Sequence, residues 1–250
     1  MGNLSELRQA HLPFQAMLYQ SRNPTRRWLY TVRTEWVNMA LEQVSGRAPH
    51  ILEIGIGCGV YTRQLASQGT VLAIDINPTF VAAASLMPNV IARVADITRE
   101  RFAPEHDVAL CSEVLEHVVD SSTALKNIYA SLKPGGFLVL TTPNAYSTVE
   151  LAARLLCFAP IQKLARMIYG ESVDDLGHIN RMTRTQLRAQ ITAAGFLVLR
   201  QADIAFYLPG IAEFCGARGL RLCQWLGRKL AGTRLSFLLW TQCWVLCRPC

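Results

Sequence analysis

The chain has 250 residues, of which 51% are hydrophobic and 17% are charged, and its net charge is +7. This length suits one domain with a sizeable core, and the composition excludes a disordered protein. The longest apolar stretch near the end, residues 235–247, is too short to span a bilayer, and the first residues lack the pattern of a secretory signal. We therefore expect a cytoplasmic protein, with peripheral membrane contact as an option.

The charge is unevenly distributed along the chain. Residues 51–145 carry a net charge of −3, whereas residues 146–250 carry +7. A basic region of this kind can attract phosphates, an anionic membrane or nucleic acid, or it can be a solvated surface. Because no separate RNA-binding module is visible, nucleic acid is not the expected partner. The sequence leaves the oligomeric state open.

An N-terminal helical cap is predicted for residues 1–48. Residues 14–45 have apolar side chains at helical spacing, interrupted by Pro24. The apolar face of the second part is expected to contain Trp28, Val32, Trp36, Met39 and Leu41.

From residue 50 onward, short apolar runs alternate with helical segments. Strands are predicted at 50–54, 70–74, 90–94, 107–111 and 136–142, with helices at 60–67, 78–86 and 121–132. This alternation predicts an α/β fold with a Rossmann-like parallel sheet that helices cover on both faces.

The alternation of predicted strands and helices is interrupted after residue 145. Residues 146–182, with an amphipathic stretch at 148–168, are expected to form a helical lid. Residues 183–250 are expected to complete the sheet, through helices at 183–194 and 212–230 and strands at 196–204 and 235–247. The whole chain, 1–250, is therefore interpreted as one domain, with residues 49–145 as the cofactor-binding core.

The clearest motif is ILEIGIGCGVYTRQLA at residues 51–66. A predicted strand containing Glu53 is followed by three glycines, Gly55, Gly57 and Gly59. Glycines let the backbone turn sharply and approach a ligand with no Cβ atom in the way. Asp75 ends the next predicted strand, where a carboxylate can accept hydrogen bonds from both hydroxyls of a ribose. Together they indicate an adenosine-containing cofactor, which could be S-adenosylmethionine (SAM) or NAD.

Further features favour SAM over NAD. The glycines run G-x-G-x-G rather than G-x-G-x-x-G, and SAM has no phosphate to bind. Asp96 and Ile97 follow the third predicted strand, where a carboxylate can accept a hydrogen bond from the adenine amino group. The segments DVALCSEVLEHV and LKPGGFLVLTTPN come next. The four motifs together resemble the class I SAM-dependent methyltransferase superfamily, in the subgroup that includes ubiquinone-biosynthesis O-methyltransferases.

The resemblance covers about residues 50–145, with a weaker similarity at residues 177–196. It implies a seven-stranded sheet whose last strand is antiparallel and lies between the fifth and the sixth. It also implies SAM as the cofactor and S-adenosylhomocysteine as its product. By position, it assigns the cofactor-binding residues: Glu53, Gly55, Gly57, Gly59 and Ser112 near the methionine part, Asp75 at the ribose, and Ile76, Asp96 and Ile97 at the adenine.

Three candidate catalytic residues are Glu113, His117 and His178, where either histidine could act as a general base. If the segment after the fourth strand is helical, Glu113, Glu116 and His117 share one face. Two carboxylates and an imidazole, with His178 as a further ligand, could then hold Mg²⁺, as a similar cluster does in small-RNA 2′-O-methyltransferases. Relatives with the same Leu-Glu-His have no known metal, so the metal question stays open.

The predicted function is methyl transfer from SAM to a small, hydrophobic acceptor, at oxygen. The alternatives are an RNA or protein methyltransferase and a non-catalytic SAM-binding protein. The complete glycine loop and both carboxylates argue against the non-catalytic alternative, since a degenerate site would be free to lose them.

Overall fold

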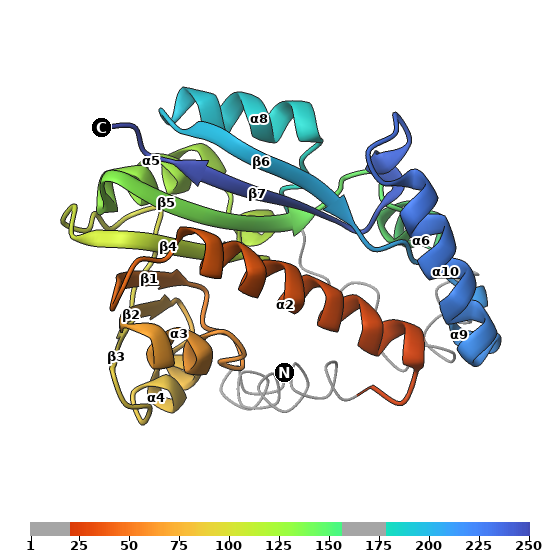
Figure 1. Cartoon of the computed structure of the whole chain (residues 1–250), viewed down its shortest axis with the longest axis horizontal. Coiled ribbons are helices and arrows are strands. Elements are labelled where there is room, and N and C mark those ends of the chain that lie inside the picture. The colour runs from red at the N-terminus through yellow and green to blue at the C-terminus, as the bar shows by residue number, and fades with distance from the viewer. Residues whose placement is uncertain (1–20, 157–178) are drawn as a thin grey trace, which may run out of the picture.

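The computed structural model describes residues 21–156 and 179–250 (Figure 1). These residues form a seven-stranded sheet with the order β3-β2-β1-β4-β5-β7-β6. The strands are β1 (His50–Ile54), β2 (Thr70–Asp75), β3 (Val90–Val94), β4 (His106–Ser112), β5 (Leu132–Pro143), β6 (Leu197–Ile204) and β7 (Thr241–Cys247). Neighbouring strands from β3 to β5 are parallel, and β7 is antiparallel to both β5 and β6. The predicted Rossmann-like sheet with its inserted antiparallel last strand is thereby confirmed.

Helices cover both faces of this sheet. One face carries α2 (Pro24–Val44), α3 (Thr62–Gln68) and α4 (Pro78–Ala84), and the other carries α5 (Ser121–Ser131) and α8 (Arg184–Ala193). At the end toward which β5 and β6 run lie α6 (Thr148–Leu156), α9 (Ile211–Phe214) and α10 (Gly216–Leu230) (Figure 1). Two short 3₁₀ turns, η1 (Leu115–His117) and η3 (Ser236–Leu238), complete the described elements. No helix among the described residues is long and apolar enough to cross a membrane.

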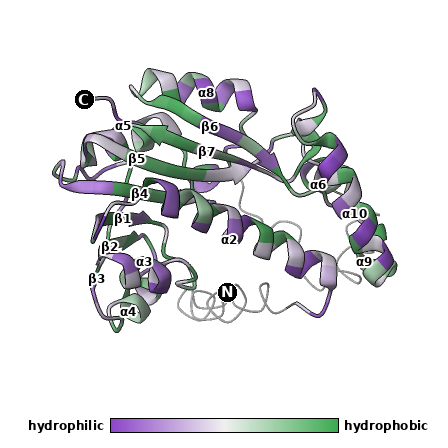
Figure 2. Cartoon of the chain, viewed as in Figure 1, coloured by the Kyte–Doolittle hydropathy of each residue, from purple (hydrophilic) through white to green (hydrophobic). Residues whose placement is uncertain are grey.

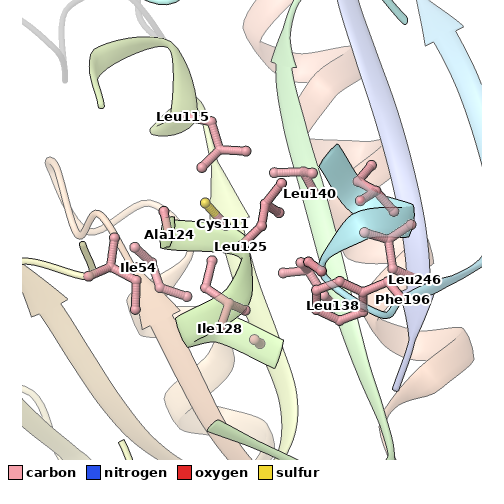
Figure 3. Close-up of a cluster of buried hydrophobic side chains, with 14 of the residues drawn as sticks. Ile54, Cys111, Leu115, Ala124, Leu125, Ile128, Leu138, Leu140, Phe196 and Leu246 are labelled. Carbon is pink, nitrogen blue, oxygen red and sulfur yellow. The ribbon is translucent and has the colours of Figure 1, made fainter. Parts of the chain in front are cut away.

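The core forms two layers because successive strand residues point to opposite faces. On β1, Leu52 and Ile54 belong to the cluster under α5 and α8, whereas Ile51 belongs to the cluster under α2, α3 and α4. Figure 3 shows part of the first cluster, in which Leu125 and Ile128 of α5 lie near β5. Each fully buried aliphatic side chain contributes roughly 1.5–3 kcal/mol. Both layers hold the central strands rigid, and their carboxyl ends are where the site lies.

Polar residues set where the helices begin. The Asn23 side chain accepts hydrogen bonds from the backbone N–H groups of Thr25 and Arg26, and Pro24 opens α2. At α8, Thr183 and Gln186 form a reciprocal capping box. Such caps satisfy backbone donors that have no partner inside the helix.

The structure corrects three sequence predictions. The predicted strand at 235–247 begins only at Thr241, because η3 occupies residues 236–238. The helix predicted at 212–230 is interrupted at Cys215, since Gly216 takes a left-handed φ of 48°. The predicted apolar face of α2 is partly wrong: Met39 is 48% exposed, while Leu29 and Val37 are buried against the rest of the fold.

Candidate active site

A cleft of about 560 Å³ opens beyond the carboxyl ends of β1, β2, β3 and β4. The segments that follow these strands form its wall, and α2 closes one side with Tyr30 and Arg33. The strand order reverses between β1 and β4, and open α/β sheets bind ligands at such a switch point. The cleft is therefore where the fold itself favours a ligand.

The glycine loop forms one wall of this cleft. Gly55, Gly57 and Gly59 all have left-handed φ values, of 79°, 53° and 72°. A Cβ atom on Gly55 would also lie 2.4 Å from Cγ2 of Val114, which is far inside contact distance. Side chains other than hydrogen are thus excluded at Gly55 by both backbone strain and space. At Gly55 and Gly57 the backbone therefore reaches the cleft with no side chain in between.

Asp75 faces the loop from the end of β2. Its carboxylate accepts hydrogen bonds from the backbone N–H of Asn77, at 2.8 Å, and of Gly57, at 3.2 Å. Burial raises the pKa of Asp75, and these backbone hydrogen bonds oppose the rise. Ile76 follows in the cleft wall with 73% of its side chain exposed. A fixed carboxylate beside an exposed apolar side chain suits a ribose and a flat aromatic base.

Asp96 and Ile97 line the cleft next to β3. One Asp96 oxygen accepts hydrogen bonds from the backbone N–H and the hydroxyl of Thr98, at 2.9 and 2.6 Å. The other oxygen lies 3.4 Å from Arg99 Nε. Ile97 is buried. The structure therefore brings the predicted adenine-edge residues to the same cleft as Asp75.

Glu53 lies beneath the loop and is not among the residues that line the cleft. It is 1% exposed, and within the described residues neither carboxyl oxygen makes a hydrogen bond of good geometry, although the Thr62 hydroxyl is close by. Burial raises the pKa of Glu53 to about 8; the Thr62 hydroxyl opposes this rise and the Asp75 charge adds to it. A buried carboxyl with unsatisfied oxygens, directly under the loop, is suited to a cationic ligand group. SAM carries such a group, the amine of its methionine part.

Ser112 and Glu113 are joined through a strand residue of β5. The Ser112 hydroxyl lies 2.9 Å from that of Thr141, which donates to Glu113 Oε1 at 3.0 Å. The other Glu113 oxygen pairs with Arg33 Nη1 at 2.7 Å. Because both oxygens are engaged, Glu113 is held in one orientation at the cleft wall.

Arg33 itself is nearly enclosed. Its guanidinium carbon lies 4.7 Å from the ring centre of Trp240 and 5.2 Å from that of Tyr30, and its side chain is 7% exposed. Stacking on aromatic rings and a carboxylate pair together hold a buried guanidinium in place. Residues far apart in the sequence thus build one corner of the cleft.

The expected shared face of Glu113, Glu116 and His117 is not found. Glu113 has a left-handed φ of 56° and lies outside η1. Glu116 is 2% exposed and accepts a hydrogen bond from Thr142 at 3.0 Å, and burial together with the Glu113 charge raises its pKa well above the usual value. His117 is exposed and lines the cleft.

Among the described residues, these positions do not bring the predicted metal ligands together. Within residues 21–156 and 179–250, no three His, Cys, Asp or Glu side chains are placed to hold a metal ion. His178 lies outside the described residues.

Sequence reasoning missed Tyr30 and Arg33. A signal for Arg33 does exist, because it falls on the buried face of α2, in register with Leu29, Trp36 and Val37. A lone cation among apolar helix positions indicates a buried charge with a partner. The sequence does not say which partner, since Glu113 and Trp240 are distant in the chain.

The lid predicted for 146–182 is described only at its two ends. None of the described residues among them lines the cleft. The two ends are joined by an ion pair of 2.6 Å between Arg181 and Glu150. The backbone N–H groups of Ile179 and Asn180 both donate to the Glu116 carbonyl at 2.9 Å. The insertion is therefore anchored beside η1, next to the cleft, and its role as a lid stays a prediction.

Comparisons with known proteins show which family this sequence matches. The family described as Methyltransferase domain matches residues 21–201. The ubiquinone biosynthesis O-methyltransferase of Pseudomonas entomophila (strain L48) is 30% identical over 168 residues, which are 62% of this chain and 72% of the relative.

Solved structures share the fold at low identity. The N-methyltransferase NodS from Bradyrhizobium japonicum WM9, in complex with S-adenosylhomocysteine, superposes with a TM-score of 0.58 at 15% identity, covering 98% of this chain and 97% of NodS. The [4+2]-cyclase SpnF superposes with a TM-score of 0.55 at 16% identity, covering 86% of this chain and 80% of SpnF. These likenesses concern the fold alone, which hosts more than one reaction.

Proposed function

Because the chain belongs to the class I SAM-dependent methyltransferases, we propose that it methylates an oxygen atom of a small, hydrophobic acceptor. The observation that carries the proposal is that one cleft contains both the cofactor-binding elements and the side chains of Glu113 and His117. The relative from Pseudomonas entomophila, named as an O-methyltransferase, supports oxygen as the acceptor atom.

Each part of the cleft has a proposed role toward the cofactor. Asp75 would accept hydrogen bonds from the ribose, and the Ile76, Asp96 and Ile97 side chains would surround the adenine. The glycine loop and Ser112 would surround the methionine part, and the buried Glu53 carboxyl behind the loop would attract its amine. Arg33 is an arginine of the cleft wall close to Ser112 and Glu113, and it is suited to the methionine carboxylate.

SAM supplies an electrophilic methyl group on its sulfonium sulfur. The acceptor oxygen forms the new O–C bond as the C–S bond breaks, and its proton must leave. His117, exposed at the cleft, would take that proton and pass it to solvent. Glu113, fixed by Arg33 and Thr141, would orient the acceptor hydroxyl. Most of the acceleration would come from holding the acceptor in line with the methyl group.

Apolar side chains in the wall favour a hydrophobic acceptor. Tyr30, Val114 and Val118 line the cleft near Glu113 and His117. Small ligands are generally bound by mostly apolar walls with a few fixed polar groups. Cytoplasmic residence stays a prediction.

The test uses methyl-labelled SAM and a total extract of the source cells. Label is expected in the organic phase, and hydriodic acid is expected to release it as volatile methyl iodide, since this reagent cleaves methyl ethers. The Asp75→Asn variant, which lacks the ribose-binding carboxylate, serves as the control and is expected to give little product. Label in acid-precipitable RNA or protein, or organic label that hydriodic acid does not release, would contradict the proposal.

A further inference from the structure

One face of α10 combines exposed cations with an exposed tryptophan. Trp225 is 51% exposed, and Leu222, one turn earlier, is 37% exposed. Residues three, four and seven positions apart lie on the same side of a helix. This places four cations around Trp225 on one face: Arg218, Arg221, Arg228 and Lys229. We call these six residues the basic aromatic face.

The opposite face of α10 already has its packing partners. Cys223 and Gly227 are buried, and a Cβ on Gly227 would lie 3.5 Å from Phe206. The neighbouring helix α9 is tied to α2 by a hydrogen bond of 2.9 Å from the Asn23 side chain to the Ala212 carbonyl. The helix is therefore packed against the fold through its opposite face, while Leu222 and Trp225 keep a large part of their surface exposed.

The charged side chains of α10 and of the chain that follows it have one sign only. Residues 214–250 contain six arginine or lysine residues and no aspartate or glutamate. Within the described part of the chain, none of the four cations of the basic aromatic face forms an ion pair. Hydrophilic and hydrophobic residues interleave along α10 at the edge of the molecule (Figure 2). A solvated helix gains solubility from mixed charges, whereas this face presents uncompensated positive charge around an aromatic ring.

We propose that the basic aromatic face of α10 docks on an anionic lipid bilayer. Cations at the rim would contact lipid phosphates, and Trp225 and Leu222 would enter the boundary between headgroups and acyl chains. Lysine and arginine around tryptophan is the composition of helices that lie in this interface. Each cation near an anionic surface adds to the attraction, so four of them produce a strong dependence on lipid charge.

The position of α10 gives such docking a consequence for the cleft. α10 and α9 both pack against α2, the helix that contributes Tyr30 and Arg33 to the cleft wall. In a docked protein, α10 would therefore touch the bilayer and α2 would connect it to the cleft. An apolar acceptor dissolved in the membrane would reach the cleft without crossing bulk water. The docking itself does not depend on which acceptor is methylated.

Vesicle co-sedimentation of the full chain tests the proposal. The protein is expected to sediment with phosphatidylcholine vesicles that contain roughly one-third phosphatidylglycerol, and to stay in the supernatant with pure phosphatidylcholine. The variant in which Arg218, Arg221, Arg228 and Lys229 are all replaced by glutamate is expected to lose partitioning by at least about tenfold. No acceptor or SAM is needed, so the outcome is independent of the proposed function.

A matched control carries the same change in charge on other elements. Its exposed cations are Arg47, Arg63, Arg101 and Lys126, each replaced by glutamate. This control is expected to keep at least half of the wild-type partitioning, and circular dichroism shows whether both variants are folded. Equal losses in the two variants would overturn the proposal, because they would reflect net charge rather than this face.

Trp225 provides a second readout that does not depend on charge reversal. Brominated lipids quench tryptophans that enter the bilayer, so wild-type fluorescence is expected to fall on binding, while Trp225→Phe is expected to lose that fall. Quenching that persists unchanged in Trp225→Phe would overturn the proposal. Salt-sensitive binding to RNA, without binding to anionic vesicles, would assign the face to nucleic acid and would also overturn it.

Discussion

The proton on Glu53 is expected to control cofactor binding. With a pKa of about 8, this buried carboxyl is mostly neutral near pH 7 in the free protein. A cationic amine placed beside it would favour the ionised form, so binding would release a proton. The affinity for S-adenosylhomocysteine is therefore expected to rise with pH, and the rise is expected to vanish in Glu53→Gln.

The magnitude follows from the ionised fraction. A pKa of about 8 leaves roughly 1% of Glu53 ionised at pH 6 and roughly 9% at pH 7. If the ionised form binds, the association constant rises about tenfold over this interval. The ligand amine is the ammonium group of an amino acid, whose pKa lies above this interval, so it stays mostly protonated from pH 6 to 7. The change in affinity therefore reports on the protein.

Isothermal titration calorimetry at pH 6.0, 6.5 and 7.0 measures this change. Glu42→Gln removes an exposed carboxylate of α2 and is the matched control, which is expected to follow the wild type. A wild-type affinity that is flat between pH 6 and 7 would refute the reasoning, as would a Glu53→Gln variant that keeps the tenfold rise. Either result would mean that the cofactor amine is not bound beside this carboxyl.

The same carboxyl is expected to make the stability of the free protein depend on pH. Its folded pKa is raised, so the folded state binds more protons than the unfolded state between about pH 4.5 and 8. The free energy of unfolding therefore falls as pH rises through this window. At pH 8, Glu53→Gln is expected to be more stable than the wild type by on the order of 3 kcal/mol, as measured by urea unfolding. Gly55→Ala is expected to weaken cofactor binding at least about tenfold, because its Cβ would lie 2.4 Å from Val114. The double variant Gly55→Ala/Val114→Ala is expected to recover only part of the binding, since the strain of the left-handed φ at residue 55 persists. The control Gly46→Ala, whose Cβ would have nothing within 4 Å, is expected to keep its free energy of unfolding within about 0.5 kcal/mol of the wild type. Arg33→Met is expected to lower the free energy of unfolding by on the order of 3 kcal/mol by leaving the Glu113 charge unpaired, and Glu113→Gln in the same protein should restore part of it. Methyl transfer is expected to survive EDTA, because the carboxylates after β4 are engaged by arginine and threonine side chains; a loss that Mg²⁺ restores would contradict this.

Local sequence patterns predicted many of the residues after β1, β2 and β3 that line the cleft. The glycine spacing, Asp75 and Asp96 each follow directly from where a parallel strand ends, and the carboxyl ends of neighbouring strands meet in space. The sheet was predictable for the same reason, since its buried strands are short apolar runs between helices. Periodicity was sufficient for the strands, and the glycine and carboxylate motifs at their ends were sufficient for these cleft residues.

The part of the cleft around Arg33 and Glu113 depends on contacts that local sequence patterns do not contain. The left-handed backbone at Glu113 turns the residue away from η1, so a helical projection placed three side chains on a face that does not form. Arg33 reaches Glu113 and Trp240 only through the packing of α2 across the sheet. The boundary of β7 was misplaced because residues 236–238 are as apolar as a strand but coil into a turn. Tertiary packing, rather than propensity, decides each of these features.

The place of β7 in the sheet has a consequence for biosynthesis. Among the described strands, β6 pairs only with β7, and Trp240, just before β7, covers Arg33. Until residues 240–247 have been made, β6 has no neighbouring strand, and Arg33 lacks the tryptophan ring on one of its sides. A chain that ends before residue 240 would keep the residues of its glycine loop but would lack the strand that joins β6 to β5.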